Sequence, residues 1–243
     1  MFLGHAGRRP GVERSGVGAL PTRLAYTAPM TKPPCEPPIR WHGAVMAGGA
    51  ARRFGSDKVF AHVGARRMID AAVASLRDAE SLTVLLGAPE RAAAVATWLP
   101  AGCTALPDDH TGLGPVGGLA TALRLQPRAW TAVLAADLPL VPRSWWPWLA
   151  AQHTPAAAAI VPRQQGGRWE PLAALYHGTL GADLARALDG ASGRQLGFQR
   201  WLDALHAAGR VSVADPTEMP ADALLNVNRP EDAAAVQRAL GAR

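Results

Sequence analysis

The stretch His42-Gly-Ala-Val-Met-Ala-Gly-Gly-Ala-Ala-Arg-Arg-Phe-Gly-Ser-Asp-Lys58 joins the end of an apolar run to a glycine turn. The turn carries three cations, Arg52, Arg53 and Lys58. Two adjacent glycines leave backbone N–H groups bare, and a helix that begins after such a turn adds the positive end of its dipole. Bare N–H groups and cations together favour a bound polyanion. The stretch therefore predicts a protein that handles nucleoside triphosphates.

The spacing of this turn excludes a P-loop of the Walker A type. Only Ser56 and Asp57 separate Gly55 from Lys58, and neither Ser nor Thr follows the lysine. We therefore do not expect a P-loop NTPase.

From residue 40 onward, short apolar runs alternate with longer helical patterns. We expect strands over residues 42–46, 82–86, 103–106, 132–135, 156–161 and 171–176. We expect helices over residues 61–78, 90–99, 117–125, 144–153, 179–188, 195–208 and 231–240. This alternation predicts one α/β domain over residues 39–243, Rossmann-like with three layers, whose mostly parallel central sheet is covered by helices on both faces.

Residues 1–38 are rich in Gly, Pro and Arg, and we expect them to form a disordered tail. The run Pro33-Pro34-Cys35-Glu36-Pro37-Pro38 suits neither a helix nor an interior strand. Met30 stands just before this run, which raises the hypothesis that translation begins there.

The composition argues against several classes of protein. The formal net charge is +6, but residues 1–40 hold six cationic and only two acidic side chains, so the body has no basic stripe and we expect no nucleic-acid partner. Cys35 and Cys103 are far apart, which fits a reducing compartment. No apolar run approaches the roughly 18 residues of a membrane span, and the N-terminus lacks an apolar signal region. We expect a cytoplasmic protein.

Three separated segments are predicted to meet at one edge of the sheet, because ligands bind outside the carboxyl ends of parallel strands. They are the turn at Gly48, the loop Gly112–Gly118 and Asp137, which ends an apolar strand. A carboxylate beside a triphosphate is well placed to hold Mg²⁺. A turn or helix-capping role for Asp137 is the alternative. Asp108 and Asp109, ahead of the glycine loop, fit turn residues equally well.

The run Gly112-Leu-Gly-Pro-Val-Gly117 matches the spacing of a dinucleotide fingerprint, with an acidic residue twenty positions after its last glycine. That fingerprint belongs to a first βα unit, whereas this loop follows the third expected strand. We therefore expect no dinucleotide site.

Two further motifs have ordinary structural explanations. Trp145, Trp146 and Trp148 lie on one expected helix, and we expect them to pack in the core or an interface rather than stack on a base. Asn226 and Asn228 precede a proline-initiated helix, so their amides either cap that helix or reach a ligand.

With these motifs in place, the chain resembles the molybdenum cofactor guanylyltransferase family, within the sugar-nucleotidyltransferase-like enzymes. The family's first motif stands here as residues 46–58, with Phe54 in place of the usual Met. The later landmarks follow in the family's order over about residues 41–240: Pro107-Asp108…Gly112-Leu-Gly114-Pro115-Val-Gly117-Gly118, Asp137-Leu-Pro139, Glu170-Pro171-Leu172, Ser192-Gly193-Arg194 and Asn226-Val-Asn228-Arg-Pro230-Glu-Asp232.

The resemblance implies transfer of GMP from Mg-GTP to the terminal phosphate of molybdopterin or molybdenum cofactor, with release of pyrophosphate. The nucleotide-diphospho-sugar transferase fold and a divalent cation are implied with it, and the choice between Mg²⁺ and Mn²⁺ stays open. Implied partners also include a molybdenum-insertion enzyme and apo-molybdoenzymes.

The same resemblance implies a role for each matched residue. Met46, Ala47, Gly48 and Gly49, with Arg53 and Lys58, would hold the triphosphate, and Asp137 would carry the metal. Asp108, Gly114 and Pro115 would contact the guanine and ribose. Arg194, Asn226 and Asn228 are candidates for the acceptor side.

One departure bears on base selectivity. After the second strand many family members have an Asn that contacts the nucleotide, whereas this chain has Leu86-Gly87-Ala88-Pro89. Three alternatives therefore stay open: a cytidylyltransferase for the same cofactor, a guanylyltransferase for another phosphorylated acceptor, and a non-catalytic module that binds a nucleotide and delivers the cofactor.

Overall fold

The strand β1 (Trp41–Met46) lies inside the central sheet and is hydrogen-bonded on both sides. It pairs in parallel with β4 (Leu82–Leu85) and with β6 (Trp130–Ala135), and Val45 lies opposite Val84 in one and Leu134 in the other. Its last four residues are buried, as expected for a parallel strand covered on both faces.

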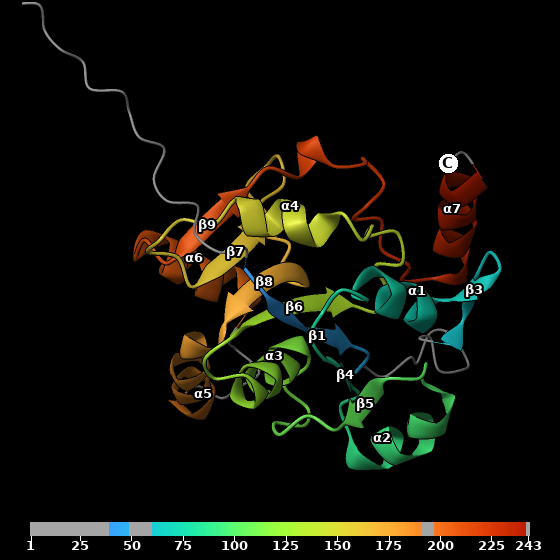
Figure 1. Cartoon of the computed structure of the whole chain (residues 1–243), viewed down its shortest axis with the longest axis horizontal. Coiled ribbons are helices and arrows are strands. Elements are labelled where there is room, and N and C mark those ends of the chain that lie inside the picture. The colour runs from blue at the N-terminus through green and yellow to red at the C-terminus, as the bar shows by residue number, and fades with distance from the viewer. Residues whose placement is uncertain (1–38, 49–59, 191–196, 242–243) are drawn as a thin grey trace, which may run out of the picture. The chain divides into compact units, whose positions relative to one another are not determined.

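The computed structural model describes residues 39–48, 60–190 and 197–241 (Figure 1), and the predicted tail 1–38 lies outside them. Within these ranges the sheet has seven strands in the order β5-β4-β1-β6-β8-β7-β9. The strands not yet introduced are β5 (Cys103–Leu106), β7 (Ala159–Pro162), β8 (Ala173–His177) and β9 (Val211–Ala214). Only β8 runs antiparallel to its neighbours. The predicted mostly parallel α/β sheet is confirmed.

Helices cover both faces of the sheet. The helices α1 (Met68–Ser75) and α4 (Trp145–Ala151) share a buried cluster with Val45, and α2 (Pro89–Val95) joins it beside β5. The opposite cluster contains Met46 and side chains of α3 (Pro115–Leu125), α5 (Gly181–Gly190) and α6 (Phe198–Ala207). Neighbouring residues of β1 thus face opposite layers, because strand side chains alternate. The three-layer prediction is confirmed.

The helix α7 (Pro230–Gly241) closes the described chain and packs beside β2 (His62–Val63). A third buried cluster lies there, and its members are Val63, Met68, Leu140, Val227 and Val236. This cluster joins the start of α1, the segment after β6 and the segment before α7. It therefore fixes two predicted site segments relative to each other.

Two of the three tryptophans of α4 are core residues. Trp145 and Trp146 are wholly buried, and their indole N–H groups donate to the Ala173 carbonyl at 2.9 Å and to Ser75 Oγ at 3.0 Å. Trp148 is half-buried and donates to a Glu218 carboxylate oxygen at 2.7 Å. The expectation of packing rather than base stacking is confirmed for this helix.

The helix predicted over residues 61–78 is wrong over residues 61–67, about its first two turns. Residues His62–Val63 pair antiparallel with β3 (Arg66–Arg67), and α1 begins only at Met68. Gly64 adopts a φ of 61°, which makes the tight turn between the two short strands. A glycine turn therefore overrides the helical apolar pattern.

The strand β9 was not predicted. It lies at the sheet edge, where it pairs in parallel with β7. Short 3-10 turns, η2 (Ala96–Trp98), η3 (Gly178–Leu180) and η5 (Pro216–Glu218), complete the described elements. The helix α3 begins at Pro115, two residues before the predicted start, because proline is favoured in the first turn.

The described helices are short. The longest are α7 with 12 residues and α3 with 11. A helix needs about 20 apolar residues to span a bilayer. None of the helices in the described ranges is long and apolar enough to cross a membrane.

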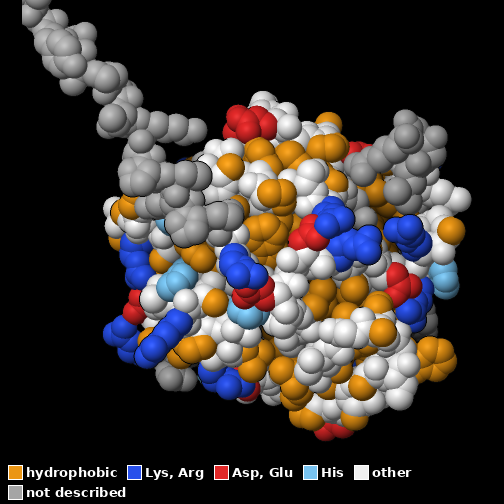
Figure 2. Space-filling model, in the orientation of Figure 1, with side chains coloured by type: hydrophobic (Ala, Val, Ile, Leu, Met, Phe, Trp, Pro, Cys, Tyr) orange, Lys and Arg blue, Asp and Glu red, His pale blue; other side chains and the backbone are white. Residues whose placement is uncertain are grey.

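Basic and acidic side chains are interspersed on the face shown in Figure 2. Several surface arginines are paired with carboxylates, among them Arg143 with Asp78 and Arg210 with Asp183. Exposed pairs of this kind contribute about 0–1 kcal/mol each. The stability of the domain therefore rests on its buried clusters.

Gly178, which follows β8, packs against the residues that follow α3, and a substitution there tests this packing. A Cβ added there would overlap the carbonyl oxygen of Gln126 and lie 2.5 Å from the Pro127 carbonyl carbon. We expect Gly178→Ala to lower the free energy of unfolding by more than about 2 kcal/mol, because backbone atoms must move.

Gly197→Ala is the matched control, since nothing lies within 4 Å of its added Cβ. Urea denaturation of both variants measures the difference. Equal unfolding free energies in the two variants would contradict the packing described here.

Candidate functional site

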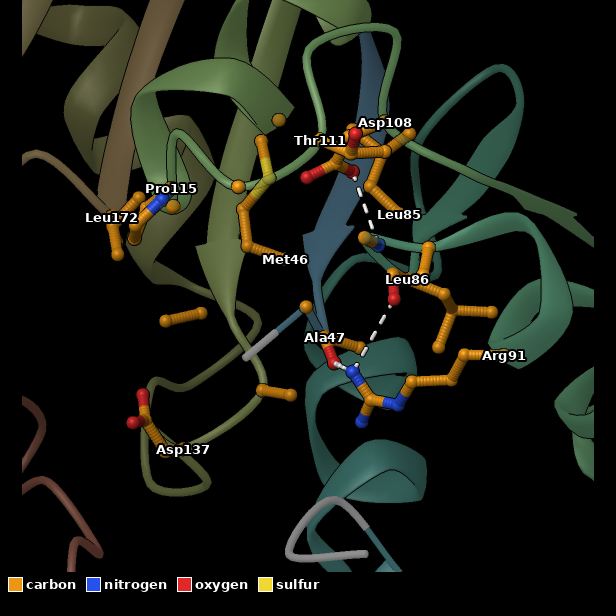
Figure 3. Close-up of a pocket in the computed structure, with 18 of the residues that line it drawn as sticks. Met46, Ala47, Leu85, Leu86, Arg91, Asp108, Thr111, Pro115, Asp137 and Leu172 are labelled. Atoms are coloured by element: carbon orange, nitrogen blue, oxygen red, sulfur yellow. Dashed lines mark hydrogen bonds between the residues drawn. The ribbon is translucent and has the colours of Figure 1, made fainter. Parts of the chain in front are cut away.

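A cavity of about 780 Å³ opens at the carboxyl ends of β1, β4 and β6 (Figure 3). From β1 the chain passes to β4 and β5 on one side, then crosses to β6 on the other. Strand order therefore reverses at β1, and crevices form at such points because the connections on either side diverge. Three predicted segments, at Gly48, at Gly112–Gly118 and at Asp137, do line this one cavity.

The end of β1 supplies the first wall of the cavity. Met46 and Ala47 are buried, whereas Gly48 is exposed. A Cβ added at Gly48 would lie 3.2 Å from the backbone nitrogen of Gly87, in the loop after β4. Glycine at position 48 therefore allows the two loops to touch backbone to backbone.

Asp108 is held in the cavity by the same loop after β4. Its own N–H donates to the Gly87 carbonyl at 2.8 Å, and the Gly87 N–H donates to Asp108 Oδ1 at 3.3 Å. Burial raises the pKa of the Asp108 carboxyl above its ordinary value, against the opposing effects of the Gly87 hydrogen bond and the Arg91 charge. A partly desolvated carboxylate is a strong acceptor for N–H donors of a ligand.

Asp109 is not among the residues that line the cavity. Its N–H donates to Thr121 Oγ1 at 2.9 Å, and its carboxylate pairs with Arg124, both on α3. Of the two acidic neighbours, Asp109 therefore anchors the loop, while Asp108 lines the cavity.

The glycine loop after β5 owes its spacing to local geometry. Gly112 and Gly114 have φ angles of 82° and 64°, which other residues rarely adopt. A Cβ at Gly117 would lie 2.5 Å from the His110 carbonyl oxygen, and one at Gly118 would lie 3.0 Å from Met46 Sδ. Turn formation and close packing thus account for the glycines without a dinucleotide.

Asp137 follows β6 and is half-buried at the cavity wall. Its carbonyl oxygen accepts from the Val227 N–H at 3.0 Å. This bond brings the exposed residues Asn226 and Asn228 next to the Asp137 loop. The two segments are about ninety positions apart in the chain, and only folding makes them neighbours.

The cap at the start of α7 comes from Asp232. One of its carboxylate oxygens accepts from the N–H groups of Asn228 and Arg229 at 2.7 and 2.8 Å. The capping role considered for the two asparagines is therefore filled, for these N–H groups, by a carboxylate inside the helix.

The residues present fit a divalent-cation site of the kind that substrate completes. Within the described residues, no group of three or more His, Cys, Asp or Glu side chains is arranged to hold a metal. Mg²⁺ commonly binds through one or two carboxylates together with water and substrate phosphates. Asp137 offers such a carboxylate at the cavity wall.

Several predicted site residues lie outside the described residues. They are Gly49, Arg53 and Lys58 in the range 49–59 and Arg194 in the range 191–196. Their assigned roles stay predictions. Pro115 and Gly114, by contrast, line the cavity as expected.

Arg91 is the one cavity residue with a long cationic side chain in the described ranges, and sequence reasoning missed it. It lies on α2, and its Nη1 donates to the carbonyl oxygens of Ala47 and Leu86 (Figure 3). A cation five residues after the end of the predicted strand 82–86 was a usable signal, since βα loops meet at this edge.

Comparisons with known proteins agree with this arrangement. Residues 43–208 match the family model described as MobA-like NTP transferase domain. The molybdenum cofactor guanylyltransferase of Cereibacter sphaeroides is 29% identical over 210 residues, which cover 83% of this chain and 98% of that protein. A relative from Deinococcus radiodurans, named "probable molybdenum cofactor guanylyltransferase", is 32% identical over 191 residues, covering 79% and 91%.

Solved structures share the fold. Molybdopterin-guanine dinucleotide biosynthesis protein A of Archaeoglobus fulgidus superposes with a TM-score of 0.66 at 20% identity, covering 83% of this chain and all of that one. A 2-C-methyl-D-erythritol 4-phosphate cytidylyltransferase of Thermus thermophilus gives a TM-score of 0.57 at 21% identity, covering 84% and 100%. Because the family model matches more than half of the chain, and the Deinococcus radiodurans relative is 32% identical over 79% of it, the chain belongs to the MobA-like NTP transferase domain family.

Proposed function

We propose that the protein is a molybdenum cofactor guanylyltransferase, which transfers GMP from GTP to the terminal phosphate of molybdopterin or molybdenum cofactor and releases pyrophosphate. The observation that carries the proposal is the cavity at the carboxyl ends of β1, β4 and β6, which gathers Gly48, Asp108 and Asp137. The names of the relatives that match most of the chain support the choice of substrates.

The loop after β1 holds the triphosphate in this proposal. Ala47, Gly48 and Gly49 offer backbone N–H groups to the phosphate oxygens, and Arg53 and Lys58 neutralise the departing pyrophosphate. The acceptor is already a phosphate oxyanion, so no side chain has to act as nucleophile. The chain's work is then mainly to place the acceptor oxygen in line with the leaving pyrophosphate.

Asp137 is the residue that would hold the divalent cation, with phosphate oxygens and water as its other ligands. Such a cation, Mg²⁺ or Mn²⁺, supplies charge neutralisation at the phosphates when it is bound. The position of Asp137 just after β6 supports this assignment, because it lines the cavity next to the segment that carries the proposed acceptor contacts Asn226 and Asn228.

Asp108 is the proposed reader of guanine. A carboxylate can accept the N1–H and the exocyclic amine of guanine together, whereas cytosine offers no such adjacent pair. Bound guanine would return hydrogen bonds to a carboxylate that burial has deprived of water. Gly114 and Pro115 line the same cavity and are assigned to the base and ribose.

The remaining assignments concern the acceptor contacts, the protein partners and the cellular location. Arg194, Asn226 and Asn228 are the proposed contacts of the molybdopterin phosphate side. A molybdenum-insertion enzyme and apo-molybdoenzymes are the proposed protein partners. The wide separation of the two cysteines supports a cytoplasmic location.

The proposal is tested by pyrophosphate release with each of GTP, CTP, ATP and UTP, with and without molybdopterin. We expect release with GTP only, dependent on the acceptor, because Asp108 selects the base and the acceptor completes the reaction. Equal turnover with CTP would defeat the guanine assignment. Tight GTP binding without any transfer would instead favour a delivery module.

A second prediction concerns Asp137. Asp137→Ala removes the carboxylate assigned to the cation, so we expect the rate of GMP transfer to fall by at least about a hundredfold. Asp183→Ala is the control, because that carboxylate pairs with Arg210 on the surface. Full activity in Asp137→Ala at saturating Mg²⁺ would remove the metal assignment.

A third prediction concerns the space beside Asp108. The methyl group of Gly118→Ala would lie 3.5 Å from Asp108 Oδ2 and press on the flexible end of Met46. We expect GTP affinity, measured by calorimetry, to fall about tenfold while the unfolding free energy changes by less than about 1 kcal/mol.

Gly117→Ala is the comparison at the neighbouring position, and we expect it to lower the free energy of unfolding before it lowers GTP affinity. Its methyl group meets the His110 carbonyl oxygen, which cannot move without the loop, so stability is lost first. Unchanged GTP affinity in a folded Gly118→Ala variant would place the base elsewhere.

A further inference from the structure

Arg91 reaches from α2 across the ends of two strands. Its Nη1 donates to the Ala47 carbonyl, just past β1, and to the Leu86 carbonyl at 3.4 Å, just past β4 (Figure 3). An Nη group carries two N–H bonds, so one nitrogen can serve both carbonyls. The side chain is half-buried and lines the cavity.

The hydrogen bonds of the sheet end where the Arg91 contact begins. The Ala47 N–H donates to the Leu85 carbonyl at 2.8 Å, and the Met46 carbonyl accepts from Ala136 at 3.0 Å. The next acceptor along the chain is the Ala47 carbonyl, and Arg91 binds it. Arg91 thus extends the fixed part of the backbone one peptide beyond the strand.

That peptide unit joins Ala47 to Gly48. The C=O and N–H of a trans peptide are coplanar and point in opposite directions. Holding the Ala47 carbonyl toward Arg91 therefore also fixes the direction of the Gly48 N–H, on the opposite side of the peptide. Glycine has no side chain to restrict rotation of this peptide plane about the backbone bonds of residue 48. The contact from Arg91 therefore removes more conformational freedom here than it would beside another residue.

We propose that Arg91 is a positioning residue for the nucleotide, which sets the Ala47–Gly48 peptide so that the Gly48 N–H is presented to the phosphates before GTP binds. This inference rests on the proposed function of the loop as the triphosphate site. It assigns a task to a residue that none of the motifs contains, on the helix α2, which follows the segment where the chain departs from the family's Asn.

Arg91 also acts on the carboxylate of Asp108. Asp108 stands across the Gly87 loop and its carboxylate is engaged by the Gly87 N–H. The positive charge of Arg91 acts on Asp108 at a distance and partly offsets the burial that raises the Asp108 pKa. Arg91 thus orders the Ala47–Gly48 peptide and also favours the charged form of Asp108, the proposed contact of guanine.

The test compares Arg91→Met, which keeps the stem and removes the donors, with Arg91→Lys, which keeps the charge. Arg128→Met is the matched control, because Arg128 is exposed and does not line the cavity. Two measurements are made on each folded protein. One is amide hydrogen exchange without nucleotide at Ala47, whose N–H bond to the Leu85 carbonyl immediately precedes the Ala47–Gly48 peptide and opens more often when that peptide is released. The other is GTP affinity by calorimetry.

For Arg91→Met we expect exchange at Ala47 to become about tenfold faster and GTP to bind about tenfold more weakly, because a loosened peptide must be ordered on binding. KM for GTP should rise more than kcat falls. Arg91→Lys should recover part of both losses, and Arg128→Met should match the unaltered protein.

Three results would overturn the inference. Weaker GTP binding with unchanged exchange would make Arg91 a direct ligand of the phosphates. Faster exchange with unchanged GTP affinity would make it purely structural, as would no change in either measurement. Failure of the unaltered protein to bind GTP would instead count against the proposed function, because the exchange measurement needs no nucleotide.

Discussion

Parallel pairing of β1 with strands on both sides is the constraint on which the site depends. The register sets Met46 opposite Leu85 on one side and Ala135 on the other, so all three strands end at the same level. Their continuing segments are forced into a common space, since the layers above and below are filled by helices. The cavity is therefore a product of sheet topology rather than of any single loop.

Hydrogen bonds between side chains and backbone then give the cavity its shape. Where a strand ends, its backbone groups lose their partners and need new ones. Asp108 supplies partners to Gly87, and Arg91 supplies them to Ala47 and Leu86. The same residues that satisfy the strand ends thus line the cavity. Structural and functional requirements therefore coincide at this edge of the sheet.

Local pattern predicted the α/β class, most of the strands and the convergence of the Gly48 turn, the Gly112–Gly118 loop and Asp137. It failed over residues 61–67, because a glycine with positive φ allowed a short hairpin where apolar spacing favoured a helix. It also missed β9, whose pairing with β7 is a contact between distant segments. Arg91 escaped notice for the same reason, since its partners lie in the ends of two other elements.

The sequence by itself determined most of the strands and helices along the chain, the glycine loop at residues 112–118 and the chemical types at the ends of the strands, because these follow from backbone preferences and periodicity over a few residues. Only the tertiary structure decided which of those groups face one another. It separated Asp108 from Asp109, brought Asn226 beside Asp137 and set Arg91 on the end of β1. Such contacts depend on the order of the strands within the sheet and on their register. The chain specifies both only through the packing of the whole domain.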